Sequence, residues 1–202
     1  MKNVDPFDYP KGRVPDYLPV LNTVLFVDIV GFSKDTTTTD MRKVIRKFGD
    51  VINEVLEPHY FWAERRKKND LILIPTGDGF AIGFHPKFDN QTVLQITAQL
   101  FKHLVQDNEF KIRMGIAKGP NMRFRDWNEI TNIFGYGINL AKRVLDCAAD
   151  NQILVHEAFA NEVLMSQRFE TLIEIREPRE IKHGEKIKVF NYYKEGEFGS
   201  PE

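Results

Sequence analysis

The sequence has little of what would mark several common classes of protein. Its 202 residues contain one cysteine, Cys147, so an internal disulfide is impossible and a metal cluster built from cysteines is excluded. Lys and Arg number 28 against 29 Asp and Glu, a balance that disfavours a general nucleic-acid-binding or anionic-membrane surface. No stretch approaches about 18 uncharged apolar residues, and the N-terminus lacks the apolar core of a signal peptide. We therefore expect a cytoplasmic protein that binds neither nucleic acid nor membrane.

What the chain does contain is the composition of a globular domain. Hydrophobic residues make up 42% and charged residues 28%, and a chain of this length buries roughly 70% of its unfolded surface without a metal or disulfide. Residues 1–20 hold four prolines and are expected to form an N-terminal arm. Residues 21–193 are expected to form one folded domain, and residues 194–202 a polar tail.

Hydrophobic periodicity predicts alternating strands and helices. The predicted strands are 23–30, 71–74, 80–84, 111–117, 153–155, 169–175 and 186–193, and the predicted helices are 40–56, 91–105, 137–149 and 156–165. The first six elements follow the order of the split βαβ unit of ferredoxin-like folds. We therefore expect an α+β fold, with this core extended to a roughly seven-stranded, mostly antiparallel sheet and the helices packed on one side of it.

Asp28 is the first side chain that the strand pattern does not explain. It interrupts an apolar strand between Val27 and Ile29, where a lone carboxylate costs several kcal/mol unless it is paired or binds a metal. Gly31 and Ser33 follow before a helix, and a strand, turn and helix in this order place backbone N–H groups around a phosphate. The alternatives are that Asp28 caps the turn or pairs with an arginine.

Asp78 belongs to the second feature, the segment Thr-Gly-Asp-Gly at residues 76–79 between two apolar strands. Asp-Gly is a strong hairpin signal, so ordinary turn chemistry explains it when it is taken alone. In a split βαβ sheet, however, the first and third strands are neighbours, which brings Asp28 and Asp78 to the same edge. Two carboxylates placed together repel unless a cation lies between them, and oxygen ligands of this kind are typical of a Mg²⁺ or Mn²⁺ site.

The third feature is a polar pair on the predicted helix 137–149. Asn139 and Arg143 lie four residues apart and therefore share a helical face. A guanidinium beside an amide suits the binding of a phosphoryl group and a ribose oxygen, although an ordinary surface arginine on an amphipathic helix is the alternative. Lys182, before the last strand, could reach a polyphosphate as a point charge.

Four segments taken together resemble the class III nucleotidyl cyclase domain. They are residues 26–33 (FVDIVGFS), 76–80 (TGDGF), 114–119 (MGIAKG) and 133–143 (IFGYGINLAKR). The resemblance covers the chain from about residue 21 to residue 193, and the two aspartates stand 50 residues apart. It implies the class III cyclase fold and head-to-tail homodimers with active sites in the interface.

The resemblance also implies roles for individual residues. Asp28 and Asp78, with Ile29 beside the first of them, would hold two divalent cations, Mg²⁺ or Mn²⁺. Asn139 and Arg143 would come from the other subunit to orient the ribose and stabilise the transition state of a nucleoside triphosphate. The implied phosphate-binding positions are Gly31, Phe32, Ser33 and Lys182.

The base-selecting positions depart from the family pattern. Purine cyclases place Lys or Glu four residues before the second metal aspartate, where this sequence has Ile74, and commonly Asp or Cys where it has Asn132; Thr76 completes the expected base pocket. An apolar side chain cannot make the hydrogen bond that a charged selector gives to a purine edge. The chain is in this respect similar to the stand-alone pyrimidine cyclases of bacterial anti-phage defence (the Pycsar type). This implies CTP or UTP as substrate, cCMP or cUMP as product, and a downstream effector that binds the product.

Four other interpretations stay open. They are an adenylate or guanylate cyclase with a divergent base pocket, a catalytically silent dimeric nucleotide-binding module, a palm-type polymerase or dinucleotide cyclase, and a structural domain. The presence of both aspartates with the Asn and Arg pair speaks against a silent module, and the Gly-Gly-Asp/Glu-Glu-Phe motif of dinucleotide cyclases is missing. Assaying each of the four ribonucleoside triphosphates with Mn²⁺ separates the enzymatic interpretations.

Overall fold

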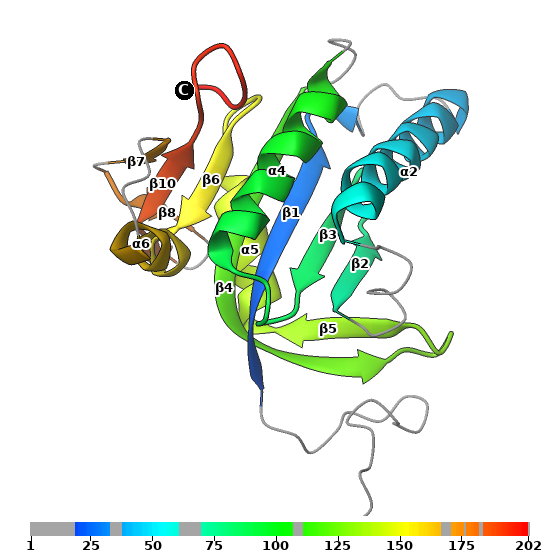
Figure 1. Cartoon of the computed structure of the whole chain (residues 1–202), viewed down its shortest axis with the longest axis horizontal. Helices are drawn as coiled ribbons and strands as arrows, with labels where there is room; N and C mark the ends of the chain where they lie inside the picture. Colours follow the sequence, from blue (N-terminus) through cyan, green and yellow to red (C-terminus); the bar gives the residue numbers. More distant parts are fainter. Residues whose placement is uncertain are drawn as a thin grey trace, which may run out of the picture.

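The computed structural model describes residues 19–32, 38–60, 70–106, 111–166, 171–175, 177–181 and 184–201 (Figure 1). The strands are β1 (Val20–Ile29), β2 (Leu71–Pro75), β3 (Gly79–Phe84), β4 (Ile112–Arg125), β5 (Thr131–Gly135), β6 (Ile153–His156), β7 (Leu172–Glu174), β8 (Arg179–Glu180), β9 (Lys186–Ile187) and β10 (Val189–Tyr192). The helices are α2 (Thr38–Tyr60), α4 (Asn90–Val105), α5 (Tyr136–Asp146) and α6 (Glu157–Ser166).

The main sheet has the strand order β2-β3-β1-β4-β6-β10-β7, and β5 pairs with β4 off this path. Within the described part of the sheet, the pairing of β4 with β6 is the parallel one and the others are antiparallel. β1 lies between β3 and β4, as the split βαβ unit requires. The predicted α+β class, ferredoxin-like core and mostly antiparallel sheet are therefore confirmed.

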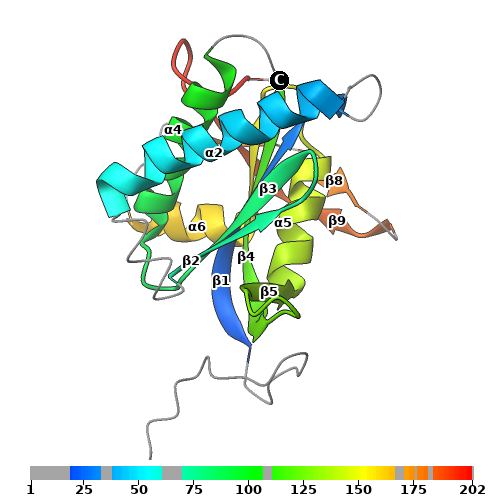
Figure 2. The same ribbon diagram turned by 90° about the vertical axis from the view of Figure 1, so that its right-hand side faces the viewer.

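The prediction that the helices cover one side of the sheet is wrong, because the sheet is covered on both faces. Strand β1 shows this in its alternation: Leu25 and Val27 belong to the apolar core shared with α2, α4 and α6, whereas Val24 and Phe26 belong to the core under α5. Figure 2 shows α5 on the opposite side of the sheet from α2. A strand buried on both faces has a near-continuous apolar run rather than an alternating one, which is the pattern of residues 23–30.

Some elements differ from the prediction in extent. β4 continues to Arg125 and returns as β5, which the sequence pattern did not predict. Asp126 supports the connection, since its Oδ1 accepts the backbone N–H groups of Asn128 and Ile130 at 2.8 and 3.0 Å. The short hairpin of β8 and β9 was also not predicted, and α2 runs past Pro58, where a helix end was expected.

The C-terminal segment predicted as a polar tail folds back onto the domain. Phe198 is buried, with its ring centroid 4.7 Å from that of Tyr192. Asn191 Nδ2 donates to the backbone oxygen of Ser200 at 2.8 Å. The predicted N-terminal arm lies outside the described residues up to residue 18. Across the described helices, none is both long and apolar enough to cross a membrane.

Candidate active site

The two candidate metal-binding aspartates lie side by side at one end of the sheet, where β1 ends and the turn between β2 and β3 leads into β3. Asp28, near the end of β1, pairs with Gly79 of β3, and the neighbouring Ile29 N–H donates to the backbone oxygen of Asp78 at 3.1 Å. The approach is close because residue 79 is glycine: a Cβ there would lie 1.9 Å from the oxygen of Val27. The topology and this glycine together bring carboxylates that are far apart in sequence to the same place.

The Asp28 carboxylate is buried and has a charged partner on the neighbouring strand. Its side chain accepts a hydrogen bond from Arg113 Nη2, on the facing residue of β4. Burial raises the pKa of Asp28 above its ordinary value; the hydrogen bond from Arg113 opposes this, the charge of Asp78 adds to it, and Lys142 of α5 opposes it. The alternative that Asp28 pairs with an arginine is therefore correct for this structure, and the two aspartates are close enough to affect each other.

These groups fit a site for divalent cations that is completed by a substrate. No cluster of three or more His, Cys, Asp or Glu side chains that could hold a metal occurs among the described residues. The chain would thus offer the carboxylates of Asp28 and Asp78, and a backbone carbonyl such as that of Ile29. Mg²⁺ is commonly bound by one or two carboxylates together with water and substrate phosphates, so this donor set suits it.

The predicted phosphate-binding positions are only partly described. Gly31 has a φ of 75°, a left-handed conformation that favours glycine, and forms the turn after β1. Phe32 is half-buried and packs its side chain against the core beneath α2. Ser33 and Lys182 lie outside the described residues, so their roles stay predictions.

Helix α5 is positioned by a side chain from the neighbouring strand. Gly135, the residue before the helix, has no side chain to cap it, and the buried Asn121 of β4 takes over that function: its Oδ1 accepts the N–H of Ile138 at 2.9 Å. An oxygen at this point satisfies one of the free donors of the first helical turn. α5 is in this way fixed at the end that carries Asn139.

The Asn and Arg pair of α5 is not joined to the aspartates in the single chain. Asn139 is exposed, and Arg143 Nη1 pairs with Glu185 Oε2 at 3.2 Å, next to β9. The α5 residue whose charge reaches Asp28 is Lys142. Any joint action of Asn139 and Arg143 with Asp28 would therefore have to involve a second subunit or a rearrangement.

The three predicted base-pocket residues lie in different surroundings: Ile74 in the core under α5, Asn132 on β5, and Thr76 in the hairpin turn that carries Asp78. Ile74 of β2 is half-buried and packs, like Ile138, against the apolar core under α5. Asn132 of β5 is half-buried, and its Oδ1 accepts the N–H of Ile133 at 2.9 Å, so its amide group presents donors to any ligand. Thr76 is exposed, and its N–H donates to the oxygen of Gly79 at 3.1 Å in the hairpin turn.

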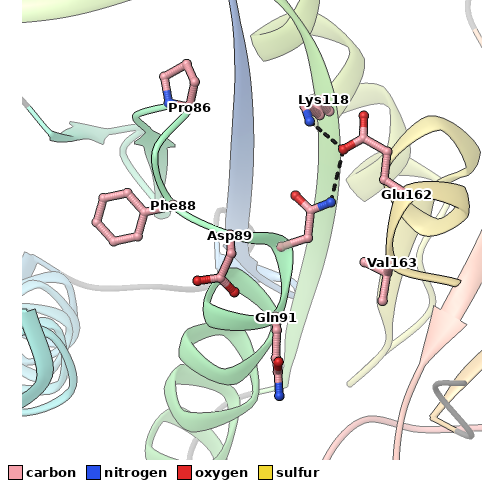
Figure 3. Close-up of a pocket in the computed structure, with 8 residues that line it drawn as sticks. Pro86, Phe88, Asp89, Gln91, Lys118, Glu162 and Val163 are labelled. Atoms are coloured by element: carbon pink, nitrogen blue, oxygen red, sulfur yellow. Dashed lines mark hydrogen bonds and ion pairs between the residues drawn. The ribbon is translucent and has the colours of Figure 1, made fainter. Parts of the chain in front are cut away.

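A separate pocket of about 570 Å³ lies on the face of the sheet that α4 and α6 cover, opposite α5 (Figure 3). Four of its polar side chains are engaged: Glu162 Oε2 accepts from both Lys118 and Asn90, and Asp89 caps α4 by accepting from Thr92 N–H at 2.8 Å. Lys118 pairs with Thr23 near the opposite end of β1 from Asp28. This pocket is therefore distinct from the candidate active site.

Arg113 and Glu185 are charged partners in the site that were not singled out from the sequence. Arg113 stands between Ile112 and Met114, at a position that an alternating strand leaves polar, so the strand pattern did not mark it. Glu185 lies in a short polar hairpin and was not marked either.

The comparisons with known proteins bear on the fold. No family model matches the chain, and no curated protein matches its sequence. Among solved structures, it resembles the guanylate cyclase domain of RhGC from Catenaria anguillulae in complex with GTP, with 16% identity, a TM-score of 0.67, and coverage of 88% of this chain and 98% of the other. A non-canonical dimeric guanylyl cyclase domain of the RhoGC fusion protein from the aquatic fungus Blastocladiella emersonii matches at 17% identity, a TM-score of 0.63, and coverage of 87% of this chain and 97% of the other.

A bacterial adenylyl cyclase shows the same likeness. CyaB from P. aeruginosa matches at 16% identity and a TM-score of 0.60, covering 89% of this chain and 97% of the other. The three comparisons show that the chain has the fold of class III cyclase catalytic domains over most of its length. At these identities the likeness establishes the fold, and the activity has to be argued from the site.

Proposed function

We propose that this chain is a nucleotidyl cyclase, which converts a ribonucleoside triphosphate to the 3′,5′-cyclic monophosphate and pyrophosphate. The observation that carries the proposal is the placement of Asp28 and Asp78 at one edge of the sheet, inside a fold shared with cyclase catalytic domains. A buried carboxylate beside a second one is costly for a structural domain, whereas it is useful to an enzyme that neutralises a triphosphate.

In the proposed reaction, the ribose 3′-oxygen attacks the α-phosphorus in line and pyrophosphate leaves. Asp28 and Asp78 would hold two divalent cations, Mg²⁺ or Mn²⁺, which supply charge neutralisation and lower the pKa of the attacking hydroxyl when bound. Backbone N–H groups of the turn at Gly31 would bind the terminal phosphates. Arg143 would donate to the α-phosphoryl oxygens as charge develops, an effect typically worth about 10²–10³ in rate, and Asn139 would hold the ribose.

We propose that the active form is a homodimer in which each site takes its aspartates from one subunit and its Asn139 and Arg143 from the other. Two features support this arrangement. Within its own chain, Arg143 pairs with Glu185 rather than with Asp28 or Asp78, and one of the structural neighbours is described as a non-canonical dimeric guanylyl cyclase domain. Closed two-fold dimers are the commonest oligomers of soluble proteins.

We further propose a pyrimidine nucleotide, CTP or UTP, as the substrate. The support is the half-buried, apolar Ile74 where purine cyclases carry a charged selector, together with Asn132, whose amide presents donors. Cytosine offers its O2 carbonyl oxygen and ring nitrogen N3, and uracil its O2 and O4 carbonyl oxygens, as acceptors to such a donor. The same resemblance supports a role in bacterial anti-phage signalling, in which a separate effector binds the cyclic nucleotide product.

The test is a product assay on the full chain. Each of ATP, GTP, CTP and UTP is supplied separately with Mn²⁺ or Mg²⁺, and the products are identified by mass spectrometry. Formation of a cyclic mononucleotide that is lost in Asp28→Asn and Asp78→Asn supports the proposal. Cyclic AMP or cyclic GMP as the main product would retain the cyclase and reject the pyrimidine assignment.

One observation favours a second candidate, a catalytically silent nucleotide-binding dimer. The ion pair of Asp28 with Arg113 leaves the first carboxylate neutralised within the chain, which a binding module could keep permanently. The same assay separates the two, because a silent module would bind a nucleotide in equilibrium dialysis and release no product.

A further inference from the structure

The ion pair between Asp28 and Arg113 joins directly facing residues of two central strands. Asp28 of β1 is opposite Arg113 of β4 in the register, and Arg113 Nη2 donates to Asp28 Oδ2. Asp28 is 8% exposed, and Asp78 lies beside it. The guanidinium therefore supplies the positive charge that this pair of acidic groups needs when no other cation is present.

The Arg113 guanidinium borders solvent and is not hydrogen-bonded at every donor. The Arg113 side chain is 28% exposed, so its far end borders solvent. Its Nε is buried without a hydrogen-bond partner among the described residues, so the pair with Asp28 is not reinforced at that atom. By contrast, the other nearby cation, Lys142, is engaged with Asp146 at 2.5 Å.

A divalent ion and this guanidinium compete for one carboxylate. A charge-assisted hydrogen bond from Arg113 occupies Oδ2, one of the two Asp28 oxygens through which the carboxylate could bind a metal ion. Two cations on the same small group also repel each other strongly in a site of low polarity. Binding of a divalent ion to Asp28 and Asp78 therefore requires that the ion pair open first.

We propose that Arg113 is a built-in counter-cation: it occupies Asp28 in the nucleotide-free chain, and it must turn away before a divalent cation binds. This rests on the metal site of the proposed function but not on the cyclisation reaction or on the identity of the base. Arg113 stabilises the site when it is empty of metal and weakens its affinity for free metal ions.

The test measures Mn²⁺ binding to the full chain without nucleotide at pH 8, from the electron paramagnetic resonance signal of free Mn²⁺. Arg113→Met removes the counter-cation and keeps an apolar stem. The matched control is Lys111→Met, two residues before Arg113 and just ahead of β4, which removes the same charge from a side chain that is 65% exposed and pairs with Asp150. We expect Arg113→Met to lower the Kd for Mn²⁺ about tenfold relative to Lys111→Met, because a charge-assisted hydrogen bond no longer has to be broken.

Thermal unfolding supplies a second measurement. In EDTA, Arg113→Met should melt several degrees below the wild type, because Asp28 is left buried beside Asp78 without a partner; Mn²⁺ should restore more of the melting temperature in this variant than in the wild type. If Arg113→Met does not fold, Arg113→Lys decides the question, since a lysine keeps the charge but not the guanidinium geometry, and its Kd should fall below that of the wild type.

Equal Kd values for Arg113→Met and Lys111→Met, or weaker Mn²⁺ binding by Arg113→Met, would overturn the proposal that Arg113 acts as a counter-cation. In the fallback case, an unchanged Kd for Arg113→Lys would do the same. If neither the wild type nor any variant bound Mn²⁺ at millimolar concentration, the two aspartates would form no metal site in the nucleotide-free chain and the counter-cation would be rejected. The proposed function would then be decided separately by the product assay, in which the triphosphate is present to complete the site.

Discussion

Gly137 lies where a side chain on Gly119 would have to go: a Cβ on Gly119 would come 2.7 Å from the Gly137 Cα. Four residues earlier on β4, a Cβ on Gly115 would come 2.4 Å from a backbone nitrogen of α5. Both distances are too short for any real contact, so α5 lies flat on β4 only because the strand presents no side chain there. This contact sets the position of Asn139 and Arg143.

The first prediction follows from this close packing. Gly115→Ala should destabilise the domain by about 1–3 kcal/mol, the usual cost of overpacking, because the group it meets is backbone and cannot move aside alone. It should also lower turnover by displacing α5. The measurement is urea denaturation together with the cyclase assay.

Gly49 provides the matched control for this change. It lies inside α2, and a Cβ there would meet nothing within 4 Å. Gly49→Ala should therefore stabilise the protein by about 0.5–1 kcal/mol through its better helix propensity. If Gly115→Ala were as stable as Gly49→Ala, the described contact between β4 and α5 would be wrong.

The second prediction concerns the shared site. Asp78→Asn and Arg143→Ala homodimers should each be inactive. Mixing them after subunit exchange should restore one competent site per mixed dimer, or about a quarter of all sites for random pairing of two-fold dimers. Absence of rescue, with exchange demonstrated by native mass spectrometry, would exclude a site built from two subunits.

The third prediction concerns the base. Ile74→Lys should raise kcat/KM for ATP relative to CTP and UTP by about tenfold or more, because a buried hydrogen-bonding group discriminates strongly between bases. Ile74→Val keeps the surface apolar and should leave the order of substrates unchanged. Competition assays with mixed nucleotides measure the ratio directly, and equal ratios for both variants would remove Ile74 from the base pocket.

The fourth prediction is a pH dependence of stability at Asp89, the N-cap of α4. Partial burial raises the pKa of Asp89, but the hydrogen bonds from Thr92 outweigh this and hold the pKa below its ordinary value. The ionised form is thus favoured in the folded state, so its contribution is complete above the ordinary value of about 3.9 and is lost as the pH falls through the lowered pKa.

Asp89→Ala should accordingly cost about 1 kcal/mol at pH 7, as expected for loss of an N-cap. The difference from the wild type should shrink as the pH falls below about 3.9. Asp89→Asn, whose amide oxygen still accepts from Thr92, should retain most of the stability at pH 7. Urea unfolding at a series of pH values checks this, and a difference that did not change with pH would contradict the assignment.

The fold was largely predictable because its core follows strong local patterns. The apolar run of residues 23–30, the Asp-Gly turn at residues 78–79 and the helical stripes determine the order of the split βαβ unit. The placement of α5 on the opposite face was not predictable from its own stripe. A stripe shows which side of a helix is buried, and only the doubly buried β1 indicates that both faces of the sheet need cover.

The site was predictable to the extent that it depends on topology. Strand neighbours bring Asp28 and Asp78 together, and this followed from the order of elements. Arg113 and Glu185 were missed because an ion pair depends on register and on side-chain direction, which local sequence does not specify. Asn121 was missed for the same reason, since it caps a helix that begins 15 residues later in the chain.

The alternation of β1 makes the chain intolerant of a single inserted or deleted residue in that strand. A shift of one position would place Asp28 in the apolar core beneath α2 and α4. After a deletion, Ile29 would take its place opposite Arg113. All the remaining side chains of the shifted strand would exchange faces at the same time. A change of length in the loops at this end of the sheet leaves the strand register intact, whereas a change in the number of residues within β1 does not.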